Sequence, residues 1–187
     1  GYVPEPPDAM FTLLAMEPPD KFEADALRNE KVKVLNAARR ISPEETGCHT
    51  VHAQYNGYCA EAGVGDYSVT PTFAALRLYV DNWRWEGVPT YLRFGKALAE
   101  KSTEIIIQFR RPPHMLFPIE EGKDIPANLL AICVQPDEGF HLEFQAKTPD
   151  VVLEMRQVDL ECHYQDAFDQ AIPDPYERVL LDTLNGD

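Results

Sequence analysis

Apolar residues recur at helical spacing in two segments near the N-terminus, which predicts two helices. The first covers residues 8–16, with an aspartate in the N-cap position and the breaker Glu17-Pro18-Pro19 directly after it. The second covers residues 24–41, where aliphatic side chains line one face, basic side chains line the other, and Ser42-Pro43 ends the pattern. A third helical pattern occupies residues 173–184.

Between the second and third helical patterns, the chain consists of short stretches rich in Val, Ile, Thr and aromatic residues, which are typical of strands. Consecutive strands without helices between them pair antiparallel, because a parallel pair needs a crossover of a dozen or more residues. The sequence therefore predicts an α+β fold, with a large, mostly antiparallel sheet flanked by helices, in one domain over residues 1–187. The predicted strands, six or seven in number, are residues 49–58, 72–80, 90–93, 103–109, 129–134, 140–146 and 151–164.

Composition and charge narrow the possible partners. The chain has 187 residues, 44% of them apolar, which is enough to bury a core without disulfides or metal. Its net charge of −14 repels nucleic acid and acidic membranes, so an anionic ligand needs a local basic cluster. No apolar run is long enough to span a bilayer, and the N-terminus lacks a signal-peptide pattern. We expect a cytoplasmic protein that binds neither nucleic acid nor membrane.

The cysteines and histidines provide few candidate metal ligands. The four cysteines form no CxxC motif, which favours reduced thiols. Cys48, His52 and Cys59 are the nearest candidate ligands for zinc, but their spacing matches no standard zinc module. His114 and His163 are candidate acid/base groups, although a lone histidine is more often structural. We predict no metal site and no catalytic residue in this chain.

The usual short catalytic and phosphate-binding signatures are absent. Gly63-Val64-Gly65 leads into a strand pattern, so it predicts a turn and not a dinucleotide-binding loop. The sequence contains no P-loop, no GxSxG and no HExxH motif.

The densest chemistry lies in and just after residues 80–98. Arg93, Lys96 and Lys101 fall within nine residues, and Gly95 permits close backbone approach beside them. Such a cluster predicts an anion-binding site, since lysine presents a compact positive charge to a phosphate. The alternative is that these are exposed strand-end charges paired with neighbouring glutamates. Trp83 and Trp85 alternate, so we expect them on opposite sheet faces, one of them in the core.

The segment Asp81-Asn-Trp-Arg-Trp-Glu-Gly-Val-Pro-Thr-Tyr-Leu-Arg-Phe-Gly-Lys96 closely resembles the hallmark of the glucose-6-phosphate 1-dehydrogenases, which ends in Val-Pro-Phe-Tyr-Leu-Arg-x-Gly-Lys. Further segments resemble the family's sequence in the family's order. They are residues 13–19, 28–35, 72–75, 104–109, 134–139 and 176–182. The resemblance covers the chain from about residue 13 to its last residue. Departures from the family pattern occur at residues 3–9 and at Thr90, where phenylalanine is usual.

The resemblance implies a two-domain enzyme, of which this chain is the C-terminal part, incomplete at both ends and without the NADP-holding Rossmann domain. Such enzymes oxidise D-glucose 6-phosphate to 6-phosphoglucono-1,5-lactone with hydride transfer to NADP, in the oxidative pentose phosphate pathway. The resemblance also implies a homodimer or homotetramer formed through the sheet. The family's Gly-rich NADP motif and its His-Tyr-Leu-Gly-Lys-type segment, which carries the catalytic base, are missing here. We therefore expect this stretch alone to be inactive.

The family's site residues transfer only where the motifs match. Lys96, Lys101 and Gln135 match positions that bind the substrate. Arg93 is the one candidate for a cofactor contact, because some members hold a second, structural NADP beside this motif. We predict no such second site, since four positions where basic groups would be expected carry other residues, namely Ser102, Ile106, Cys133 and Glu143.

A second interpretation remains open. The chain would then be a non-catalytic relative that acts as a hexose-phosphate-binding or dimerisation module.

Overall fold

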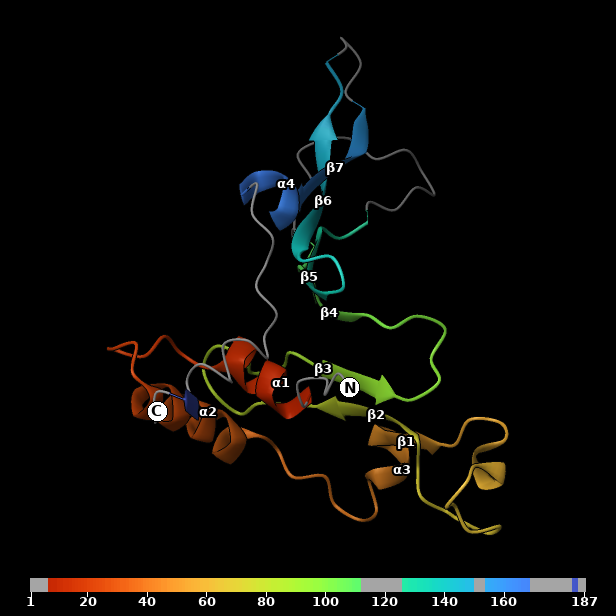
Figure 1. Cartoon of the computed structure of the whole chain (residues 1–187). Coiled ribbons are helices and arrows are strands. Elements are labelled where there is room, and N and C mark those ends of the chain that lie inside the picture. Colours follow the sequence, from red (N-terminus) through yellow and green to blue (C-terminus); the bar gives the residue numbers. More distant parts are fainter. Residues whose placement is uncertain (1–6, 112–125, 150–153, 169–182, 185–187) are drawn as a thin grey trace. The chain divides into compact units, whose positions relative to one another are not determined.

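The computed structural model describes residues 7–111, 126–149, 154–168 and 183–184 (Figure 1). The chain divides into two compact units, residues 1–99 and residues 100–187, and each is described by itself. The prediction of one domain stays a prediction. His114 and nearly all of the helix predicted at 173–184 lie outside the described residues. Within the described ranges, no helix is both long and apolar enough to cross a bilayer.

The first unit begins with two helices, α1 (Pro7–Ala15) and α2 (Ala24–Ala37), which contact each other. The prediction for α2 was four residues too long. Ala38 leaves the helix with extended backbone angles and forms an isolated bridge with Val80, and the Arg39 N–H donates to the Tyr79 carbonyl at 2.9 Å. Pairing with a distant strand end therefore stops a helix whose local pattern would have continued.

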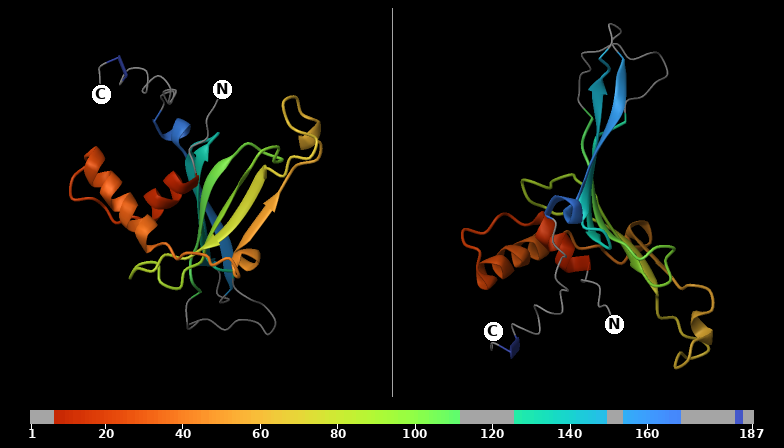
Figure 2. Two further views of the ribbon diagram at one scale, coloured as in Figure 1. Left: turned by 90° about the horizontal axis from the view of Figure 1, so that it is seen from below. Right: turned by 45° about the horizontal axis from the view of Figure 1, so that its top comes forward.

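A three-stranded antiparallel sheet completes the first unit. Its order is β1 (Thr50–Ala53), β2 (Phe73–Leu78) and β3 (Thr90–Gly95), and the three strands lie side by side in Figure 2. The strand predicted at 49–58 is much shorter than expected. It follows the one-turn helix α3 (Thr46–His49) and gives way to the 3₁₀ helix η1 (Tyr58–Ala60), which the left-handed Gly57 introduces.

The core of this unit is small. Phe11, Ala15, Val34 and Val80 are its buried apolar residues, and half-buried side chains from β2 and β3 pack against them. Trp85 joins this cluster and donates its indole N–H to the Ala15 carbonyl at 3.0 Å. The core thus ties α1 and α2 to the sheet and to the loop before β3.

As expected, one tryptophan lies in the core and the other does not, but strand alternation is not the cause. Trp83 is fully exposed, whereas Trp85 packs on the core. Both residues lie in a turn and not in a strand, so strand alternation does not set their directions. Asn82 makes this turn by accepting the Trp85 backbone N–H on its side-chain oxygen at 2.9 Å.

An exposed ion pair lies beside the same junction. Arg39 donates to both carboxylate oxygens of Asp81, at 2.6 and 3.1 Å, and its guanidinium stacks over the Tyr79 ring. The hydrogen bonds from Arg39 lower the pKa of Asp81 below its usual value. This pair adds to the backbone bridge that joins the end of α2 to the end of β2.

The second unit is a four-stranded antiparallel sheet followed by a short helix. The strands pair in the order β4 (Thr103–Gln108), β5 (Leu129–Gln135), β6 (Gly139–Lys147) and β7 (Met155–His163), and α4 (Tyr164–Phe168) comes directly after β7. The predicted α+β class with antiparallel strands is confirmed. In the described part of the chain, however, the strands form two sheets instead of one large sheet.

The strand register gives the second sheet one apolar and one polar face, because directly paired residues point to the same side. Leu142 pairs with both Leu130 and Leu160, and these apolar pairs continue along β5, β6 and β7. The opposite face carries His141 and Glu143 on β6, with acidic residues beside them on β7. The apolar face is only partly covered by described residues, since Leu160 is 51% exposed.

Candidate functional site

Lys96 directly follows β3, and the backbone around it is tightly constrained. Its N–H donates to the Thr72 carbonyl at 2.8 Å, which fastens it to the start of β2. A Cβ on Gly95 would lie 3.0 Å from that same carbonyl oxygen, so a larger residue would fit only if the neighbouring backbone moved by a few tenths of an ångström. Ala97 then adopts a left-handed conformation with φ of 52°. This geometry ends the strand and leaves Lys96 exposed to solvent.

Lys101 and Gln135 come to the same end of the β4–β5 pair in the second unit. Gln135 is the last residue of β5, and its register partner is Thr103, the first residue of β4. Lys101 lies two residues before Thr103 and is exposed, whereas Gln135 is half-buried. A bulge between Thr103 and Glu104 interrupts the ladder at this end. The predicted pair of substrate contacts is thus adjacent along the strand ends.

The three predicted substrate residues belong to both units, Lys96 to the first and the other two to the second. Among the described residues of the first unit, no carboxylate forms an ion pair with Lys96, and pairing with the glutamates of the second unit stays an alternative. Their roles in binding remain predictions.

The described residues do not fit a dinucleotide. Gly63-Val64-Gly65 lies in the turn-rich segment between η1 and β2, as the sequence predicted, and it does not open a helix. Arg93 is exposed on β3, where its register partner is Ala75. One arginine on a strand does not make a pyrophosphate cradle, so no chemical step is assigned to NADP within these residues.

The candidate zinc ligands from the sequence do not converge. Cys48 lies in α3, His52 in β1 and Cys59 in η1, and all four cysteines of the chain are free. The one convergent group of metal-ligating side chains in the described residues lies elsewhere, on β6 and β7. It contains His141, Glu143 and Asp159. Sequence reasoning missed it because the two strands that carry it pair only in the folded chain.

His163 is held between two carboxylates at the end of β7. Its Nδ1 lies 2.9 Å from Asp137, and its Nε2 lies 3.5 Å from Glu161. Both ring nitrogens are therefore occupied by charged partners of the sheet itself. This arrangement supports the structural interpretation of His163 over an acid/base role.

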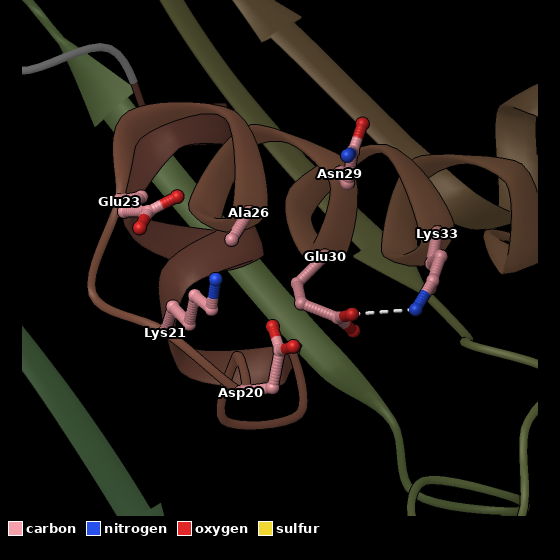
Figure 3. Close-up of a pocket in the computed structure, with 7 residues that line it drawn as sticks. All are labelled: Asp20, Lys21, Glu23, Ala26, Asn29, Glu30 and Lys33. Carbon is pink, nitrogen blue, oxygen red and sulfur yellow. Dashed lines mark hydrogen bonds and ion pairs between the residues drawn. The ribbon is translucent and has the colours of Figure 1, made fainter.

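Among the surface depressions of the described first unit, two bear on ligand binding. The depression at α2 is lined by both acidic and basic side chains, and Lys33 pairs with Glu30 inside it (Figure 3). Three carboxylates against two lysines make it unsuited to an anion. Its lining residues are Asp20, Lys21, Glu23, Ala26, Asn29, Glu30 and Lys33.

The second depression has a volume of about 90 Å³ and is lined by Arg39, Arg40, His49 and Arg77, among others. This volume is room for about three water molecules. The buried Nε of Arg77 has no hydrogen-bond partner among the described residues.

Comparison with known proteins gives a consistent result. The family model for the glucose-6-phosphate dehydrogenase C-terminal domain matches residues 9–187. Glucose-6-phosphate 1-dehydrogenase of Mycolicibacterium smegmatis is 42% identical over 95% of this chain, and that of Aggregatibacter actinomycetemcomitans is 38% identical over 95%. The chain spans only 38% and 37% of the length of these two relatives.

Solved structures agree with the family match. The crystal structure of glucose-6-phosphate 1-dehydrogenase from Mycobacterium avium superposes with a TM-score of 0.79 at 35% identity, over 98% of this chain and 37% of that one. A structure of glucose-6-phosphate dehydrogenase in complex with its substrate glucose 6-phosphate gives a TM-score of 0.80 at 37% identity, over 96% of this chain and 37% of that one. The chain therefore belongs to the family of glucose-6-phosphate dehydrogenase C-terminal domains.

Proposed function

We propose that this chain is the C-terminal part of an NADP-dependent glucose-6-phosphate 1-dehydrogenase. The complete enzyme oxidises D-glucose 6-phosphate to 6-phosphoglucono-1,5-lactone with hydride transfer to NADP. The observation that carries the proposal is the family match over residues 9–187, together with a relative of the same fold whose structure contains glucose 6-phosphate. We also propose, from the sequence, that the protein is cytoplasmic.

The role proposed for this chain is to bind the substrate and not to move the hydride. Lys96 supplies a positive charge to the phosphate group, and Lys101 and Gln135 supply a second basic contact and a polar contact. The constrained backbone at Gly95 and Ala97 supports the assignment of Lys96, because it fixes where the lysine leaves the strand. A fixed backbone at this position lowers the backbone entropy that is lost on binding.

Substitution of Lys96 by alanine tests the phosphate contact. A charge-assisted hydrogen bond contributes about 1.5–3 kcal/mol, so we expect the Kd for glucose 6-phosphate to rise about 10- to 150-fold. The change is measured by chemical-shift titration of the 187-residue chain. Lys21→Ala is the matched control, because Lys21 is an exposed lysine of the same unit that lies far from β3 in sequence.

Unchanged glucose 6-phosphate affinity in Lys96→Ala, with the control also unchanged, would refute the phosphate contact. Adding NADP and glucose 6-phosphate to the same chain tests whether this stretch is inactive by itself. We expect no NADPH formation from this stretch, whereas turnover above background would mean that it contains a catalytic base and a cofactor site.

We also propose that the chain assembles as a homodimer or homotetramer through its second sheet. The support is the apolar face of β5, β6 and β7, on which Val158 and Leu160 are 40% and 51% exposed. Burying exposed aliphatic side chains against a second copy contributes about 25 cal/mol for each Å² of apolar surface. A charge placed on this face would remain unpaired and would oppose assembly.

Leu160→Asp is therefore expected to weaken self-association at least about tenfold, as measured by sedimentation equilibrium. Ile106→Asp is the matched control, because Ile106 is 55% exposed but lies on the opposite, polar face of the sheet. Equal weakening by both variants, or a monomeric parent chain, would contradict assembly through the apolar face.

A further inference from the structure

The polar face of the second sheet brings three metal-ligating side chains together. His141 and Glu143 are two residues apart on β6, so both point to this face, and Asp159 is the direct register partner of Glu143 on β7. One ligand atom from each of the three lies within 4.8 Å of the others. The His141 Nε2 lies 3.7 Å from the Asp159 carboxylate. The group therefore contains one imidazole nitrogen and two carboxylate oxygens around one point.

Strand pairing holds these ligands in place. Glu143 and Asp159 lie inside a nine-pair ladder, so their separation is fixed by backbone hydrogen bonds and not by a flexible loop. Gln157 donates its side-chain amide to Glu143 at 3.0 Å and to Asp159 at 3.4 Å. These bonds orient both carboxylates, as outer-shell groups do around bound metals.

The electrostatics of this group call for a cation. Like charges directly opposite each other on paired strands are destabilising. In the described residues, no lysine or arginine forms an ion pair with Glu143 or Asp159, although the two carboxylates face each other. Glu161, the register partner of His141, adds a third acid to the same face. The neutral Gln157 amide offsets the repulsion among these carboxylates only in part. A divalent cation would offset it more fully.

We propose that His141, Glu143 and Asp159 form a binding site for a divalent transition-metal ion such as zinc. Zinc bonds to imidazole nitrogen and carboxylate oxygen at about 2.0–2.2 Å, which places neighbouring ligand atoms about 3.4 Å apart in a tetrahedral site. The 3.7 Å between His141 and Asp159 is close to this separation. Three protein ligands leave the fourth position to water.

The donor set also argues against the cations that prefer oxygen ligands alone. Calcium and magnesium prefer sites made of oxygen ligands alone, and the imidazole of His141 does not suit them. Zinc is bound more tightly than manganese or iron by a site of this composition. The ligands must be deprotonated to bind, so zinc affinity falls as the pH is lowered.

Calorimetric titration of the metal-free 187-residue chain with zinc tests the proposal. We expect saturable binding of one zinc ion per chain, and His141→Asn and Asp159→Asn should each raise the Kd at least tenfold. Titration with cobalt provides a second readout, because visible absorption bands from a coordinated cobalt ion should disappear in His141→Asn. Circular dichroism of each variant distinguishes lost ligation from lost folding.

His163→Asn is the matched control. His163 also lies between two carboxylates of this sheet, but they contact different ring nitrogens and do not converge on one point. We expect its zinc affinity to remain within twofold of the parent chain. Cys48→Ser should likewise change nothing, because the candidate cysteine ligands lie in the other unit. Absence of saturable zinc binding, or equal affinity in the parent chain and in His141→Asn, would overturn the proposal.

Discussion

Replacing Gly139 with alanine is expected to lower the free energy of unfolding of the second unit by about 3 kcal/mol or more. Gly139 is the first residue of β6, is buried, and pairs with Cys133 of β5 and with His163 of β7. A Cβ at this position would overlap the carbonyl oxygen of Cys162. Overpacking usually costs about 1–3 kcal/mol, and here the obstructing atom belongs to the backbone of the paired strand β7, which cannot give way as the end of a flexible side chain could.

The measurement is urea denaturation of the variant, combined with amide hydrogen exchange across β6 and β7. We expect lost protection in these two strands first, because the overlap forces β7 away from the start of β6. Gly65→Ala is the control, since a Cβ there meets nothing within 4 Å. An unfolding midpoint shared by Gly139→Ala and the parent chain would show that β7 does not pass as close to Gly139 as the structure places it.

Replacing Phe11 with alanine is expected to destabilise the first unit by about 3–5 kcal/mol. Phe11 is 5% exposed and is the largest of the four buried apolar residues of this core. Such a small core has few other side chains to fill the cavity that the ring leaves. The expected consequence is detachment of α1 from β3 and α2, its packing partners.

Phe22→Ala provides the matched control, because Phe22 is 96% exposed and lies in the loop between α1 and α2. Loss of its ring should change the unfolding free energy by no more than about 0.5 kcal/mol. Thermal and urea unfolding, followed by tryptophan fluorescence, measure both variants, since Trp85 packs on the same core. Similar stabilities for Phe11→Ala and Phe22→Ala would contradict the core as described.

The local sequence was sufficient to predict where most of the strands lie. The predicted strands at 72–80, 90–93, 103–109, 129–134 and 140–146 correspond to β2, β3, β4, β5 and β6. These stretches are rich in β-branched and aromatic residues, whose preference for extended backbone acts within a few residues. Sequence reasoning failed where distant segments decide, as at the end of α2, where Val80 pairs with Ala38.

The candidate substrate residues also include one that a local motif predicts and one whose position depends on distant segments. Lys96 was predicted from a local motif, and the neighbouring Gly95 lies close to the backbone of Thr72 and Phe73, while its expected role beside an anion stays a prediction. No local pattern, however, shows that Gln135 ends its strand opposite Thr103. Strand register depends on which segments pair, and the spacing of residues along one strand does not contain that information.

The sequence by itself determined the family, the antiparallel α+β class and the acidic net charge, because these follow from motifs, short-range backbone preference and composition. The tertiary structure alone decided that the described strands form two sheets and that Trp85 enters the core while Trp83 does not. It also decided that Asp159 lies opposite Glu143, sixteen residues away in the chain. The physical reason is that strand pairing and core packing join segments distant in sequence, and their free energy depends on the whole fold.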